Sequence, residues 1–192
     1  SGGGAATWGN GSTGGPRLTG TISSNNSLVG RYTYWKGGDA VGSGGITLLS
    51  NGHYVVSSPD WSTGTSSTAA GAVGAITWGN ANTGVTGTVS AANSLIGTKQ
   101  CDCVGSAGVT ALSNGNYVVN SLYWNNGTIS SAGAVTWASG TGATSGTVSS
   151  SNSLVGTTDW DLVGNDGVTA LSNGHYVVRS RWWNNGTISD AG

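Results

Sequence analysis

Three short motifs recur along the chain, and their spacing constrains the fold more than any other feature. The first, Ser-Asn-Gly-x-Tyr-Val-Val, occurs at residues 50–56, 113–119 and 172–178. The second, Asn-Ser-Leu-Val/Ile-Gly, occurs at 26–30, 93–97 and 152–156, and the third ends in Thr-Trp at Trp8, Trp78 and Trp137. From Trp78 to Trp137, and from Gly97 to Gly156, the separation is 59 residues. A fixed period of this length is typical of a repeat architecture.

Composition excludes several function classes. The 192 residues carry 6 basic and 7 acidic side chains, for a net charge of -1. Nucleic-acid surfaces need clustered Lys and Arg, so we expect no nucleic-acid partner. No stretch approaches the roughly 20 apolar residues of a membrane span, so we expect no membrane insertion. With no Phe or Met, the nine Trp, together with Tyr, Val and Leu, must fill the core of one domain over residues 1–192.

Each unit is predicted to contain four short antiparallel strands. In the last unit, residues 167–171 are apolar and residues 175–180 are rich in β-branched and aromatic side chains, as strands are. The Ser-Asn-Gly between them predicts a hairpin with a two-residue type I′ turn, because Asn-Gly accepts positive φ angles. No segment combines helical periodicity with capping signals. The sequence therefore predicts an all-β protein.

Four strands in about 60 residues fit a propeller blade. They also fit one lobe of a three-fold β-trefoil or one rung of a solenoid. The order of the motifs favours the first of these. Asp-x-Val-Gly at 39–42, 102–105 and 161–164 precedes an apolar strand, the Asn-Gly turn, Tyr-Val-Val, and then Gly-Ala-Val-Thr-Trp or a variant of it.

This order resembles the FG-GAP repeat of integrin-α-like β-propellers, which implies propeller blades. Val stands at positions 41, 104 and 163 where that family has Phe, and the family's Asp-rich calcium loop is missing, so no calcium is carried over. The motifs also look similar to tandem repeats of bacterial haemagglutinin-like surface proteins. That resemblance implies a secreted or cell-surface location.

The predicted blades are approximately residues 39–97, 102–156, and 161–192 completed by 1–30. Joining the two ends would place Trp183 and Trp8 17 residues apart, as Trp61 and Trp78 are. Propellers typically have four to eight blades, so three are too few. We therefore predict a homo-oligomer in which two chains complete a six-bladed ring. A closed trefoil-like chain and a head-to-tail filament are the alternatives.

The titratable residues favour a structural role over catalysis. Asp39, Asp102 and Asp161 recur in every unit, which favours turn structure because Asp readily caps turns. His53 and His175 occupy equivalent hairpin positions, whereas a catalytic His is expected once, beside a nucleophile or an acid. We predict that the protein is not an enzyme.

No metal or cofactor site is predicted. Cys101 and Cys103 flank Asp102, but the further ligands of a zinc site are not seen nearby. The other units have no Cys at the matching positions, so these two residues are interpreted as local or incidental, with a strained or an intermolecular disulfide as the alternative.

Six of the nine Trp recur at equivalent positions, and we predict that they pack in the core. They are Trp8, Trp78 and Trp137 on the third strand, and Trp61, Trp124 and Trp183 after the second. Accordingly, Trp137→Ala is expected to destabilise the fold by roughly 3 to 5 kcal/mol, as a core truncation does.

The other three Trp, with polar neighbours, predict a carbohydrate site. Exposed aromatic rings stack on sugars, while amides and charged groups bind the hydroxyls. Trp182 follows Arg181 and lies where the other units have Asp60 and Tyr123. The predicted ligand-binding residues are Trp35, Trp160, Trp182, Tyr123, Asp60, Arg181, Asn184 and Asn185.

We therefore expect a lectin-like or adhesin module with repeated weak sites for glycans, which gain avidity by repetition. The alternative is a structural or assembly module of an extracellular surface protein or fibre. In that case the non-repeating Trp would be buried between chains.

Overall fold

The computed structural model describes residues 3–12, 18–31, 39–63 and 71–192. In these residues the regular structure consists of short β-strands, so the all-β prediction is confirmed. The strands are β1 (Ala5–Ala6), β2 (Leu28–Val29), β3 (Ile46–Leu48), β4 (Tyr54–Ser58), β5 (Ala75–Gly79), β6 (Gly87–Thr88), β7 (Leu95–Ile96), β8 (Val109–Ala111), β9 (Tyr117–Ser121), β10 (Ala134–Ala138), β11 (Gly146–Thr147), β12 (Ser153–Val155), β13 (Val168–Ala170) and β14 (Tyr176–Val178).

The strands group into four successive units. Unit 1 contains β1 and β2, unit 2 contains β3 to β7, unit 3 contains β8 to β12, and unit 4 contains β13 and β14. In units 2 and 3 the first three strands form an antiparallel meander, and the fifth strand pairs with the third. The antiparallel pairing predicted for these first three strands is confirmed.

The fourth strand of each complete unit leaves its own sheet. β6 pairs in parallel with β2 of unit 1, and β11 pairs in parallel with β7 of unit 2. The expectation of four antiparallel strands within one unit is therefore wrong at this strand. Each unit instead reaches back and adds a strand to the unit before it.

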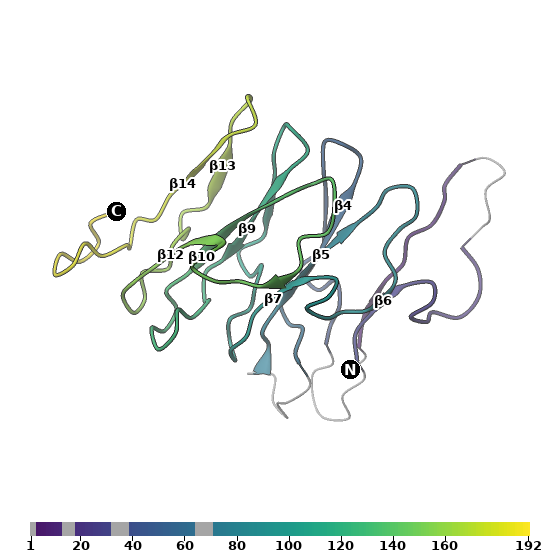
Figure 1. Cartoon of the computed structure of the whole chain (residues 1–192), viewed down its shortest axis with the longest axis horizontal. Coiled ribbons are helices and arrows are strands. Elements are labelled where there is room, and N and C mark those ends of the chain that lie inside the picture. Colours follow the sequence, from purple (N-terminus) through teal and green to yellow (C-terminus); the bar gives the residue numbers. More distant parts are fainter. Residues whose placement is uncertain (1–2, 13–17, 32–38, 64–70) are drawn as a thin grey trace.

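The units follow one another in a row along the longest axis, from the purple first unit to the yellow fourth unit (Figure 1). Within the described residues, the sheets do not close into a propeller ring or a three-fold trefoil body. Residues 1–30 and 161–192 were expected to complete one blade together. Their described strands, β1 and β2 in the first segment and β13 and β14 in the second, lie in separate sheets at opposite ends of the row (Figure 1). The open arrangement is closest to the solenoid alternative.

The core lies between the units, in clusters built from equivalent residues of successive repeats. The cluster between units 1 and 2 contains Leu28, Val41, Val56, Trp61 and Val89. The cluster between units 2 and 3 contains their equivalents, Leu95, Val104, Val119, Trp124 and Val148. β4 of unit 2 and β9 of unit 3 are thus buried on both faces, which explains why the Tyr-Val-Val strand is continuously apolar instead of alternating with polar residues.

The Ser-Asn-Gly turn has a different geometry from the predicted type I′ turn. In unit 2 the amide of Gly52 donates to the carbonyl of Leu49 at 2.9 Å, and the amide of Leu49 donates to the carbonyl of His53 at 2.8 Å. Gly52 has φ 87°, whereas Asn51 does not have the positive φ that a type I′ turn requires at both central residues. The hairpin is therefore a three-residue loop with Gly in the left-handed region.

Candidate assembly interface

The hairpin tips of successive units are joined by side-chain hydrogen bonds. Ser50 Oγ donates to the carbonyls of Leu112 and Ser113, both at 3.1 Å. Asn51 Nδ2 donates to the carbonyl of Gly115 at 3.3 Å. These bonds link unit 2 to unit 3, and they give the recurring Ser-Asn pair a role beyond the turn itself.

The same contacts recur between units 3 and 4. Ser113 Oγ donates to the carbonyl of Ser172 at 3.0 Å, and Asn114 Nδ2 donates to the carbonyl of Gly174 at 3.2 Å. Ser and Asn side chains therefore form a ladder that runs along the row of hairpins in Figure 1. The same Ser and Asn recur in successive units because they make the same contacts with the next unit.

The third-strand Trp residues form a second series of contacts between units. Trp8 Nε1 donates to the carbonyl of Ala81 at 2.9 Å, which ties unit 1 to unit 2. Trp78 Nε1 donates to the carbonyl of Gly140 at 3.0 Å, which ties unit 2 to unit 3. Trp137 is the equivalent residue of unit 3, and 47% of it is exposed.

The prediction that all six repeated Trp are core residues therefore needs correction. Trp61 and Trp124 are buried, as predicted, but Trp137 is not. The reason is that a third-strand Trp packs toward the following unit instead of into its own sheet. Unit 4 contains only β13 and β14, so the described residues include no equivalent of the Gly140 loop for Trp137 to contact.

A third series of contacts comes from the recurring Asp. Asp102 is fully buried, and its Oδ2 accepts bonds from the amides of Thr98 and Lys99, both at 2.8 Å. Its Oδ1 accepts from the amide of Asn125 at 3.0 Å and from Asn125 Nδ2 at 2.8 Å. The carboxylate thus joins a loop of unit 2 to a loop of unit 3, which supports the turn interpretation over catalysis.

Asp161 makes the equivalent contacts between units 3 and 4. Its carboxylate accepts bonds from the amides of Thr157 and Thr158 and from the amide and side chain of Asn184. Burial alone would raise the pKa of Asp161. The hydrogen bonds to Thr157, Thr158 and Asn184 outweigh burial and hold the pKa below its usual value. Asp39 binds the amide of Arg31 and Ser62 Oγ in the same way.

The predicted carbohydrate residues do not converge on one site. Trp160, Trp182 and Tyr123 are exposed, as that prediction requires, whereas Trp35 lies outside the described residues. Tyr123 and Trp182 hold equivalent positions in units 3 and 4, and Asp60, which is also exposed, holds that position in unit 2. These residues form a series along the units instead of a single pocket.

The polar partners of that predicted site are largely engaged within the protein. Asn184 binds Asp161 through Nδ2 at 2.8 Å and accepts a bond from the amide of Asp190 at 3.2 Å. The guanidinium of Arg181 lies 5.3 Å from the ring centre of Trp182 and forms an ion pair with Asp166 at 3.4 Å. Asn185 is exposed in the adjacent turn. Asn184 therefore holds the loop in place and has little capacity left for a ligand.

The two cysteines are thiols on a backbone of positive φ. Cys103 Sγ lies 3.8 Å from the carbonyl of Ala72. Burial, followed by the charges of Cys101, Asp60 and Asp102, raises the pKa of Cys103 to about 11. Among the described residues, no group of three His, Cys, Asp or Glu side chains is placed to hold a metal ion. No helix in the same part of the chain could cross a membrane.

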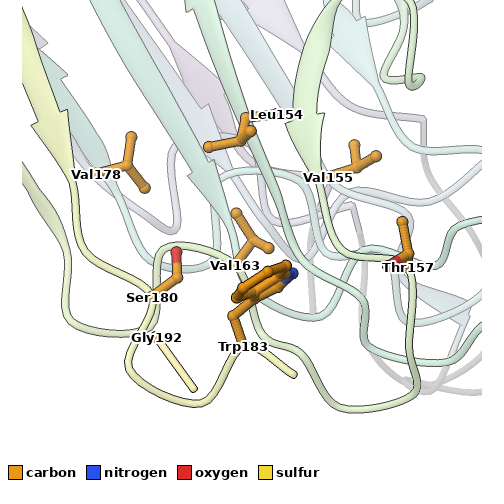
Figure 2. Close-up of a pocket in the computed structure, with 8 residues that line it drawn as sticks. All are labelled: Leu154, Val155, Thr157, Val163, Val178, Ser180, Trp183 and Gly192. Atoms are coloured by element: carbon orange, nitrogen blue, oxygen red, sulfur yellow. The ribbon is translucent and has the colours of Figure 1, made fainter. Parts of the chain in front are cut away.

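An apolar groove of about 520 Å³ opens on the face of unit 3 and unit 4 that no other unit covers. We call it the C-terminal groove. Figure 2 shows Trp183 at its centre, with Val163, Leu154, Val155 and Val178 around the ring. The remaining lining residues are Thr157, Ser180 and Gly192.

The groove is an incomplete version of the clusters between the other units. Val163, Val178 and Trp183 are equivalent to Val104, Val119 and Trp124 of the cluster between units 2 and 3. Leu154 is 57% exposed, whereas its equivalent Leu95 is 1% exposed. The sequence analysis did not predict this groove, because the motifs that line it are the same as those that line the covered clusters.

Together the sheets and the ladders define an all-β repeat protein whose units stack in an open row. The family described as a repeat of unknown function (DUF5650) matches the chain over residues 1–43, 48–106, 111–165 and 170–192. The chain belongs to this family, and the four matched segments correspond to the four structural units. No curated protein and no solved structure matches the chain.

Proposed function

We propose that the protein is a structural assembly module, which builds an extended, rigid row from repeated units. The observation that carries this proposal is the ladder of Ser and Asn side chains between hairpin tips, which recurs from unit 2 to unit 3 and from unit 3 to unit 4. Polar side chains that recur in a repeat are here used for contacts between neighbours. In such arrays, stability is approximately a sum of unit and nearest-neighbour terms.

The recurring Asp and Trp contacts support the same function. Each lies at the boundary of two units, and each uses its polar atoms on a backbone or side chain of the next unit. A catalytic site would instead need titratable side chains that remain available to bind a substrate or to react with it. In this proposal the repeated polar groups hold neighbouring units together.

Inserting a second copy of residues 109–167 after residue 167 tests this proposal. In an open row, the added unit lengthens the particle, and small-angle X-ray scattering reports a larger maximum dimension. The added unit also raises the free energy of unfolding, because it contributes one more interface. An unchanged maximum dimension would overturn the proposal, because a ring or compact body can absorb a unit without becoming longer.

Carbohydrate binding is the second candidate function. It is supported by the exposed rings of Tyr123 and Trp182 at equivalent positions and by the exposed ring of Trp160. Repetition of a weak aromatic site would give avidity toward a surface that carries many sugars. This second proposal also draws on the resemblance to integrin-like and haemagglutinin-like repeats. That resemblance implies a secreted or cell-surface location, which is part of the same proposal.

A glycan array with the labelled protein tests the second function. Binding that is competed by the free sugar, and that Trp182→Ala weakens without unfolding the chain, supports it. Tyr123→Asp is the informative companion variant, because unit 2 already has Asp60 at this position. A blank array at high protein concentration removes this candidate and leaves the assembly function.

A further inference from the structure

One hydrogen bond recurs in units 2 and 3 with acceptors of different chemistry. In unit 2 the amide of Ala81 donates to Nδ1 of His53 at 3.1 Å. In unit 3 the amide of Gly140 donates to Oδ1 of Asn116 at 3.0 Å. His53 and Asn116 both stand at the variable position of the Ser-Asn-Gly-x-Tyr-Val-Val motif, and each donor lies three residues after the third-strand Trp. This position therefore needs an acceptor, which a neutral imidazole and a carboxamide both supply.

The loop that donates this bond also receives the preceding unit. The carbonyl of Ala81 accepts from Trp8 Nε1 of unit 1 at 2.9 Å. The carbonyl of Gly140 accepts from Trp78 Nε1 of unit 2 at 3.0 Å. In each unit, the hairpin side chain thus fixes the residue on which the Trp of the preceding unit is bound.

We propose that His53 makes the boundary between units 1 and 2 sensitive to acid, because the bond from Ala81 exists only while the imidazole is neutral. Both nitrogens of an imidazolium ion are donors, so the protonated ring has no acceptor left for the amide. Histidine side chains take up this proton near pH 6.5 in water, whereas the carboxamide of Asn116 does not titrate. The inference rests on the proposed function, which assigns contacts between units to assembly, and it adds a regulation of one boundary.

The segments packed around His53 carry no ionised side chain. They contain no Asp, Glu, Lys or Arg, and their only other titratable group is the hydroxyl of Tyr54. Burial raises the pKa of Tyr54 above its usual value, so this hydroxyl stays neutral where histidines titrate. An acid response of the loop therefore has His53 as its source. The segments are residues 5–12, 46–58, 75–84, 109–116 and 138–141.

The ring of His53 has a second contact, with Trp78. The two ring centres lie 4.8 Å apart, and the ring planes are tilted by 54°. A cation is attracted to an indole ring, so the imidazolium remains beside Trp78 after it has released the amide of Ala81. Acid is thus expected to free the loop without removing the side chain from its place. The exchange of the Ala81 amide is for this reason a more direct readout than the stability of the whole chain.

Amide hydrogen exchange measured by NMR tests the inference by comparing Ala81 with Gly140 in the same sample. Intrinsic exchange depends on pH in the same way for both amides, so the ratio of their protection factors isolates the two hydrogen bonds. Between about pH 7.5 and about pH 5, the neutral fraction of an ordinary imidazole falls about 30-fold. We expect the protection of Ala81 relative to Gly140 to fall by about tenfold over this range. The indole N–H of Trp8 should lose protection relative to that of Trp78 at the same time.

Three variants show whether the histidine is responsible. His53→Asn introduces the residue that unit 3 has at this position, so the acceptor is kept and the dependence on pH should disappear. Asn116→His should transfer the dependence to the amide of Gly140. His175→Asn is the matched control, because it removes the only other histidine of the chain, in unit 4, and should leave the response of Ala81 unchanged. Circular dichroism at each pH verifies that every variant is folded.

A wild-type ratio that stays constant over this pH range would overturn the inference, whatever the variants do. A pH dependence that persists in His53→Asn would also overturn it, and so would a Gly140 amide that stays insensitive to acid in folded Asn116→His. A constant ratio in a protein that still lengthens when a unit is inserted would reject only the acid sensitivity. A ratio that changes in a protein that does not lengthen would instead keep the role of His53 and reject the open row.

Discussion

Trp78 Nε1 lies 3.0 Å from the carbonyl oxygen of Gly140, so a side chain of unit 2 is tied to a loop of unit 3, 62 residues further along the chain. The equivalent Trp8 of unit 1 makes the same contact with Ala81 of unit 2. The recurring Trp, Ser, Asn and Asp side chains therefore make their contacts mainly at the boundaries between units. The first two predictions below compare equivalent residues, of which only one makes the contact with the next unit.

Trp78→Phe should destabilise the protein more than Trp137→Phe. The first substitution removes the bond to Gly140, which is worth about 1 kcal/mol of unfolding free energy. The second removes an exposed indole and should change that free energy by less than about 0.5 kcal/mol. Urea unfolding of both variants measures the difference. Equal losses would contradict the role assigned to Trp78.

Asn114→Ala should cost more stability than Asn173→Ala. Both side chains accept a bond from the amide two residues later in their own turn, at 3.1 Å. Only Asn114 also donates to the next unit, at Gly174. The difference in unfolding free energy between the two variants therefore isolates the contact between units, and we expect about 1 kcal/mol. A difference of zero would mean that the Asn recurs for its turn alone.

Acid should weaken the boundary between units 3 and 4. The pKa of Asp161 is below its usual value in the folded protein, so its ionised form contributes stability above the pKa of the unfolded chain. That contribution is lost as the pH falls from there through the folded pKa. Asp161→Asn should be less stable than the wild type at neutral pH, and the gap should narrow as the pH falls below about 4. Urea unfolding from pH 2.5 to pH 7, in approximate half-unit steps, measures the gap. A gap that widens in acid would contradict this sign.

Cys103 should react slowly with alkylating reagents. Its pKa of about 11 leaves only ~0.1% of the thiol ionised at about pH 8, and the thiolate is the reactive form. In a Cys101→Ser variant, the alkylation rate should rise about tenfold per pH unit until the pH approaches the pKa. Mass spectrometry of the iodoacetamide adduct provides the rate. A rate that is already flat between about pH 8 and 9 would show that the thiol is not shielded as described.

Periodicity in the sequence was sufficient to predict an all-β repeat protein and the antiparallel pairing of the first three strands in units 2 and 3. It was also sufficient to assign Asp102 and its equivalents to structure. The recurrence of Asp, Ser and Asn indicated fixed local roles, and hydrogen bonds to these residues account for them. The strands and the roles of the recurring residues depend on short segments, whose residue types are themselves sufficient to indicate a strand or a turn.

Closure of the row and the partner of each strand could not be predicted in the same way. Gly87–Thr88 has the composition of a strand whichever neighbour it pairs with, and nothing local indicates that it joins the preceding unit. Leu95 and Leu154 stand in the same motif, yet one is buried and the other exposed, because the unit after Leu95 contributes Val148 to the cluster, whereas unit 4 contains only β13 and β14. Exposure in a repeat depends on position in the row, which a single motif does not contain.

The open row itself is tested most directly by distances between equivalent positions. Asp60, Tyr123 and Trp182 are exposed, hold the same place in units 2, 3 and 4, and can each be replaced by Cys for spin labelling after Cys101 and Cys103 are changed to Ser. In an open row, pulsed electron paramagnetic resonance should give a distance from 60 to 182 of about twice the distance from 60 to 123. Three equal distances would indicate a three-fold closed body and would contradict the account.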